Sequence, residues 1–156
     1  MSGIIGQVGA RSGVIGSTTD GTQLDYEEGD WTAAMSDGST SLSMTSTAGY
    51  YTKIGNMVHI SGYFATDNLN GLTSEAIRIT GLPFEIASTN ASFSIGATRC
   101  TYINITAGES VVVLGRVGQS YIELHVWGET TGTSAMTATE WSADGTIMIG
   151  FSYRAA

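Results

Sequence analysis

The sequence predicts an all-β protein, a single β-sandwich of jelly-roll type with seven or eight antiparallel strands and an extended Gly-rich N-terminal arm. Short runs rich in β-branched and aromatic residues alternate apolar with polar side chains, and turn residues recur about every eight to twelve positions. The 21 Gly and the single Pro suit a turn-rich chain. Its 156 residues suffice for one domain with a core.

Residues 1–23 are the predicted arm, and they contain six of the glycines. The motif Ser-Gly-Ile-Ile-Gly at 2–6 returns as Ser-Gly-Val-Ile-Gly at 12–16. Glycine at this density disfavours a helix, so an extended segment is expected. The arm repeats pairs of β-branched residues, which a purely polar linker would lack. These apolar pairs favour docking on a partner over a disordered tail. The residues expected to dock are Ile4, Ile5, Val8, Arg11, Val14 and Ile15.

The body is expected to span 24–156, and its clearest element is a hairpin. Residues 50–54 and 57–65 form two β-rich runs around Gly55-Asn56, a two-residue turn with Gly in its first position. Apolar residues alternate through the second run, which predicts one buried face and a second face that is only partly polar.

The other strands follow from the same two signals. The first strand is predicted with Trp31 on its inner side, followed by a turn at 37–40. Residues 128–143 read as a polar loop with a brief strand, and no helix is predicted. The remaining predicted strands are 30–36, 76–80, 97–106, 110–117, 120–127 and 146–154.

Four short motifs in the body resemble a known family. They are Leu24-Asp-Tyr-Glu-Glu-Gly-Asp-Trp-Thr32, Tyr51-Thr-Lys-Ile-Gly-Asn56, Gly81-Leu-Pro-Phe84 and Phe151-Ser-Tyr-Arg154. Their order is similar to that in a domain at the C-terminal ends of bacteriophage tail fibres and related virion surface proteins. The resemblance implies a trimeric virion component on the capsid exterior or the tail, and not an enzyme.

The resemblance leaves three functions open. In tail fibres the similar domain follows a long shaft, whereas here it follows a short arm. The leading expectation is therefore a trimeric capsid decoration or cement protein, attached to a capsid or tail protein through the arm. The alternative is a tail-fibre or receptor-binding tip that recognises host surface glycans. The third is a small polysaccharide-degrading spike enzyme.

Charge and composition exclude other classes of function. The net charge of −8 and pI near 4.4 argue against nucleic-acid and anionic-membrane binding, since six basic residues lie scattered. The single cysteine, Cys100, excludes an intrachain disulfide and a Cys-rich zinc site. No stretch approaches the ~20 apolar residues of a membrane helix, and no secretory signal is recognised.

Two groups of side chains could bind a metal or act as a base. Ca²⁺ takes six to eight oxygen ligands, but the spacing of Asp25, Glu27, Glu28 and Asp30 does not match an EF-hand loop, so a solvated or salt-bridged junction is favoured. His59 and His125 each occupy an alternating strand position among apolar neighbours without a nearby nucleophile motif. A structural or interface role is favoured for both histidines.

Candidate sugar-binding and catalytic residues are weighed in the same way. Glu123, Glu129 and Glu140 could supply the paired carboxylates of a glycosidase, and their separation would decide the question. The aromatic residues Tyr102, Tyr121, Trp127 and Trp141 could stack on sugars, although aromatic residues in strands more often belong to a core. No catalytic, cofactor-binding or metal-binding residue is predicted.

The low charged fraction predicts self-association. Charged residues make up 13% of the chain, against about 25% in typical domains. Strand faces that are too apolar to remain in water are expected to lie between subunits. The expected subunit-interface residues are Tyr26, Trp31, Met57, His59, Tyr63, Tyr121, His125 and Trp127.

Overall fold

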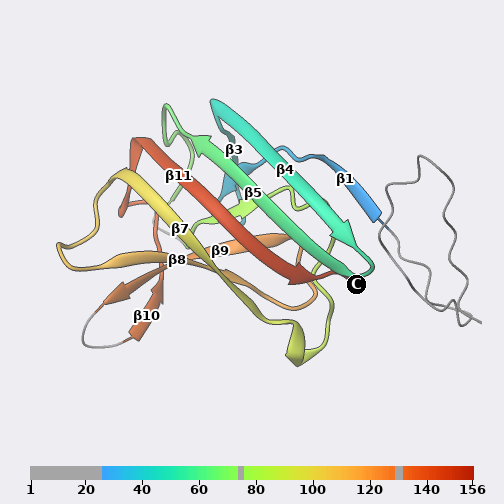
Figure 1. The fold of residues 1–156 in the computed structure, drawn as a ribbon. Helices are drawn as coiled ribbons and strands as arrows, with labels where there is room; N and C mark the ends of the chain where they lie inside the picture. The colour runs from blue at the N-terminus through green and yellow to red at the C-terminus, as the bar shows by residue number, and fades with distance from the viewer. Residues whose placement is uncertain (1–25, 74–75, 129–131) are drawn as a thin grey trace, which may run out of the picture.

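The computed structural model describes residues 26–73, 76–128 and 132–156, and these residues form an all-β fold (Figure 1). Eleven strands and one short 3₁₀ turn, Asn90–Ser92, make up the described regular structure. The strands are β1 (Tyr26–Asp30), β2 (Ala34–Ser36), β3 (Ser41–Ser43), β4 (Ser46–Ile54), β5 (Met57–Ala65), β6 (Arg78–Thr80), β7 (Ser94–Ile103), β8 (Ser110–Gly115), β9 (Tyr121–Gly128), β10 (Gly132–Ala135) and β11 (Trp141–Arg154). No helix in these residues is long and apolar enough to cross a membrane.

All eleven strands belong to one antiparallel sheet, which corrects the prediction of a sandwich with seven or eight strands. The order is β1-β4-β5-β11-β7-β8-β9-β6-β2-β3, with β10 paired to β9. The sheet is strongly curled into a half-barrel, so that one face encloses the core and the other faces outward. A local alternation pattern defines faces but not partners, and it therefore could not separate one curled sheet from two packed sheets.

The curl is enforced by a short connection near the N-terminus. β1 begins the strand order and β2 lies eight places along it, a distance of about 38 Å in a flat sheet. Residues 31–33 alone join these strands, and they can span only about 14 Å. The two ends of the sheet must therefore approach each other. Gly81, which directly follows β6, packs against this connection, and a Cβ there would collide with the carbonyl oxygen of Thr32.

Strand β7 forms the corner at which the sheet bends. Its residues 94–97 pair with β8, whereas 97–103 pair with β11. At the corner, a Cβ on Gly96 would lie 2.7 Å from both Phe151 and Val113, and one on Gly115 would lie 2.5 Å from Phe151. Glycine is needed at both positions because the Phe151 ring packs directly on the two backbones.

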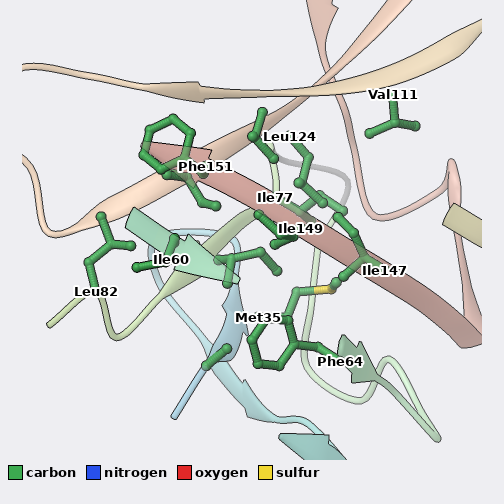
Figure 2. Close-up of a cluster of buried hydrophobic side chains, with 14 of the residues drawn as sticks. Met35, Ile60, Phe64, Ile77, Leu82, Val111, Leu124, Ile147, Ile149 and Phe151 are labelled. Carbon is green, nitrogen blue, oxygen red and sulfur yellow. The ribbon is translucent and has the colours of Figure 1, made fainter. Parts of the chain in front are cut away.

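The core lies inside the curl, where both halves of the sheet contribute aliphatic and aromatic side chains (Figure 2). The predicted alternations are confirmed, since Val58, Ile60 and Phe64 of β5 are buried. The inward-facing residues of β9 and β11 are buried as well: Ile122, Leu124, Val126, Ile147, Ile149, Phe151 and Tyr153.

Several predicted elements are confirmed, and others change in extent. The hairpin around Gly55-Asn56 forms as expected, with β4 and β5 in register from Ile54↔Met57 to Ser46↔Ala65. The predicted first strand, 30–36, is instead divided between β1 and β2, because Trp31 turns into the core and its backbone N–H bonds to Gly49. The brief strand expected within 128–143 is β10.

Candidate functional site

The chain ends of the body lie at one end of the half-barrel, and several connections between strands lie at the other. Tyr26 at the start of β1 pairs with Ile54, and Arg154 at the end of β11 pairs with Met57. Both chain ends of the body therefore lie beside the β4–β5 turn, as Figure 1 shows for the C-terminus and β1. The opposite end carries the β5–β6, β7–β8 and β10–β11 connections. These are called the terminus end and the loop end below.

Hydrogen bonds fix the connections at the loop end. The indole Nε1 of Trp141, buried at the start of β11, donates to the Thr66 hydroxyl at 2.9 Å. The backbone N–H of Thr66 donates to the carbonyl of Gly145 at 3.0 Å, and that of Asn104 donates to the carbonyl of Glu140 at 2.8 Å. Three connections far apart in sequence are thereby joined into one surface.

Tyr102 stands out on this surface. The pairing of β7 with β11 jumps from Thr101↔Thr146 to Ile103↔Trp141, so that residues 142–145 loop out opposite Tyr102. Tyr102 has a φ of 56°, the only positive φ at a non-Gly residue in the described regions, and its side chain is 68% exposed. A bulky residue in this conformation costs about 1–2 kcal/mol. The backbone strain here presents an aromatic ring to solvent.

Asp37 connects the β2–β3 turn to the β5–β6 connection, a role that the predicted turn at 37–40 did not anticipate. Its Oδ1 accepts from the backbone N–H groups of Ser39 and Thr40 at 2.9 and 2.7 Å. Its Oδ2 accepts from the N–H and the hydroxyl of Thr73, each at 2.9 Å. These hydrogen bonds, with Thr40 the largest contribution, hold the pKa of the buried Asp37 carboxyl well below its ordinary value.

The pKa of Asp37 is lower in the folded than in the unfolded state. The ionised carboxylate therefore stabilises the fold at pH values above the ordinary Asp pKa of ~3.9, and this stabilisation is lost as the pH falls below that value. We expect Asp37→Asn to lower the thermal midpoint at pH 7 and to reduce the loss of stability between about pH 5 and pH 2. Thermal unfolding over a pH series measures both effects. The control is Asp67→Asn, which changes an exposed residue of the β5–β6 connection; an equal effect there would contradict the specific role of Asp37.

A hollow of about 530 Å³ lies on the outer face of β7, β8, β9 and β10. It is bounded by the 80% exposed Ile95 on β7 and the 55% exposed Trp127 on β9. Its lining is otherwise made of small and aliphatic residues, with two polar side chains, and comprises Ile95, Gly96, Ala97, Val112, Val113, Leu114, His125, Trp127 and Thr133. The hollow is thus an apolar surface open to water.

A charged group lies beside the hollow on the same face. The Glu123 carboxylate binds the Arg116 guanidinium at 2.7 Å and the His125 Nε2 at 3.2 Å. Burial raises the pKa of Glu123, but the hydrogen bonds from Arg116 and His125 outweigh it and lower the pKa below its ordinary value. Arg78 on β6 lies over the Tyr121 ring at 4.5 Å.

The expected interface residues fall into three sets. Tyr26, Met57, His59 and Tyr63 are exposed on the outer face of β1 and β5. Tyr121, His125 and Trp127 share the outer face of β9. Trp31 is 4% exposed and packs against Phe64 with ring centroids 4.9 Å apart, which corrects its place in the interface set and agrees with the inner side predicted for it.

The candidate sugar-binding aromatic residues are also divided by the fold. Trp141 is a core residue, which corrects its inclusion, and Tyr121 is half-buried toward the terminus end. Tyr102 and Trp127 are exposed near the loop end. The sequence proposed Tyr102 for its type alone, since nothing in the local pattern indicates its strained conformation.

The candidate carboxylates that the structure describes have partners within the chain. Glu123 binds Arg116 and His125, as described above. Glu140 accepts from the backbone N–H and the hydroxyl of Thr137 at 2.7 and 2.9 Å. Glu129 lies outside the described residues.

The acidic stretch does not converge on one point. Strand alternation places Glu27 and Glu28 on opposite faces of β1, where Glu27 accepts from the Tyr51 hydroxyl at 2.7 Å and Glu28 from the Tyr26 hydroxyl at 2.5 Å. Within residues 26–73, 76–128 and 132–156, no group of three His, Cys, Asp or Glu side chains could hold a metal ion. Asp25 and the docking residues of the arm lie outside the described residues.

No family model and no curated protein sequence matches the chain. Among solved structures, the chain is similar to the Dettilon tailspike protein gp208, with a TM-score of 0.65 and 14% sequence identity. The similarity covers 83% of this chain and 24% of that chain. The half-barrel fold therefore also occurs in part of a phage tailspike protein.

Proposed function

We propose that this chain is a non-enzymatic structural domain of a bacteriophage tail, whose loop end binds polysaccharide on the host surface. The fold similarity to part of a tailspike protein supports a tail location over the capsid decoration role expected from the sequence. The absence of enzymatic activity is supported by Glu123 and Glu140, because both carboxylates are engaged in structural contacts.

The observation that carries the proposal is Tyr102, a strained and exposed aromatic residue at the end opposite both chain ends of the body. Any chain that connects the body to a particle leaves from the terminus end, so the loop end faces away from that attachment. Backbone strain of this kind is retained where the surrounding structure or function requires it. Aromatic rings offer an apolar face with a polar tip, which suits stacking on a sugar ring.

Replacing Tyr102 tests this proposal because binding is then expected to fall without any loss of stability. We expect Tyr102→Gly to remove the ring and relieve the positive φ, which leaves thermal stability unchanged or higher. Binding to an array of purified bacterial lipopolysaccharides and capsular polysaccharides should fall at least about tenfold, the loss of a stacking contact of about 1.4 kcal/mol.

The matched control is Tyr26→Ala, which removes a 58% exposed tyrosine at the terminus end and should leave binding intact. If neither variant alters binding, or if the unmodified protein binds no polysaccharide on the array, the host-contact proposal fails. Copy number in purified virions separates the locations, since a dozen or so copies indicates a tail part and hundreds indicate capsid decoration.

We propose that the domain associates as a homotrimer through the outer face of β4, β5 and β11. This face exposes large apolar side chains at Tyr50, Ile54, Met57, Tyr63 and Met148, each between 38% and 63% exposed. Met57→Glu should weaken association by placing a charge in the contact. Light scattering at micromolar concentration should give a trimer for the parent chain; a 16.3 kDa particle would contradict the proposal.

A further inference from the structure

The hollow on the outer face of β7–β10 favours an aliphatic occupant over a sugar. Its lining offers polar side-chain atoms only from His125, Thr133 and the indole of Trp127. A buried sugar would leave many hydroxyl groups without partners, and each lost hydrogen bond costs about 1–3 kcal/mol. Uncharged aliphatic side chains have no hydrogen bonds to lose on entering such a surface, and they gain from removing apolar area from water.

We infer that the hollow binds the segment around Val14 and Ile15 of the same chain. This segment has the chemistry that the lining requires, since residues 12–17 read Ser-Gly-Val-Ile-Gly-Ser and carry no charge. The flanking glycines would let its backbone approach the sheet closely. The inference gives the predicted docking arm a target within its own chain and does not depend on the proposed tail function.

The length of the chain before Tyr26 permits this contact. Tyr26 lies five strand intervals from β8, about 24 Å across the sheet. Along the strands, the register through Asp30↔Tyr50 and Gly150↔Ala97 places the hollow about 13 Å beyond Tyr26. The combined distance is about 27 Å, whereas the eleven residues from Ile15 to Tyr26 can extend about 36 Å.

The same chain is a better source of this segment than a second copy. A tethered segment that can span the distance is present at an effective concentration in the millimolar range. The nearer aliphatic pair, Val14–Ile15, is favoured over Ile4–Ile5 because effective concentration falls as the connecting chain lengthens.

Trp127 reports directly on this contact in the full chain. Trp31 and Trp141 are 4% and 1% exposed in the body, so Trp127 is the tryptophan whose environment the segment would change. We expect the double substitution V14D/I15D to shift tryptophan emission to longer wavelength and to increase quenching by acrylamide. The control S17D/T18D adds the same charge beside the pair and should leave both unchanged. Equal spectra for the parent and V14D/I15D would overturn the inference.

Disulfide trapping identifies the chain that supplies the segment. In a Cys100→Ser background, Ile15→Cys combined with Ile95→Cys should form a cross-link within one chain under mild oxidation. Ile15→Cys combined with Asp67→Cys, an exposed residue of the β5–β6 connection, is the control and should not cross-link. A product that is mainly a cross-linked dimer, or cross-linking at least as fast in the Asp67 control, would contradict docking within the chain.

Discussion

Gly81→Ala is expected to destabilise the protein by about 4 kcal/mol, an exceptionally large effect for the addition of one methyl group. Gly81 has a φ of +91°, and a Cβ there would collide with the backbone carbonyl of Thr32. Neither group can move easily, because Thr32 belongs to the three-residue connection that brings the two ends of the sheet together. Denaturant unfolding measures the change through its midpoint at constant slope.

Gly55→Ala separates the cost of the backbone conformation from the cost of the collision. Gly55 also has a positive φ, +60°, but a Cβ added at this position would have no other atom within 4 Å. Its replacement should therefore cost only about 1 kcal/mol. Similar losses for both variants would mean that the close approach of Gly81 to Thr32 does not constrain the connection between β1 and β2.

Phe151→Ala is expected to cost about 3–5 kcal/mol, since the side chain is fully buried and its loss leaves a cavity. The ring fills the corner of the sheet between Gly96 and Gly115 and stacks on Tyr153 with centroids 5.5 Å apart. The glycine backbones carry no side chains that could move into the space, so relaxation would be limited.

The control for Phe151 is Phe93→Ala, because Phe93 precedes the same corner but is 48% exposed. Its loss should cost less than about 1 kcal/mol. Both free energies come from the same denaturant titration. A loss at Phe151 no larger than that at Phe93 would show that the corner does not depend on the packed ring.

The sequence predicted local elements better than it predicted their arrangement. Alternation marked the inner face of β5, β9 and β11, and the Gly55-Asn56 turn defined the β4–β5 register, because these features depend on neighbouring residues. The single sheet depends on β7 pairing with two different strands, and nothing in the composition of residues 94–103 records that exchange.

For the candidate site as well, the sequence indicated residue types but not their arrangement in space. Tyr102, Trp127 and His125 were candidates because of their residue types. The exposure of Tyr102 and Trp127, and the backbone strain at Tyr102, depend on how the strands pair in the folded protein. The hollow could not be predicted, since its walls come from four strands whose order the sequence does not state. Asp37 carried a visible signal in Asp37-Gly38, which marks a turn, although its bonds to Thr73 link a segment far along the chain.

The position of β11 has a consequence for synthesis in the cell. β11 lies between β5 and β7, yet it is made after the other strands that the structure describes. Until β11 has emerged from the ribosome, β5 and β7 would each expose an unpaired edge, which is prone to aggregation. Completion of the sheet is therefore expected only after residues 141–154 have left the exit tunnel, and ribosome-bound chains that stop before Trp141 should be the form most readily captured by chaperones.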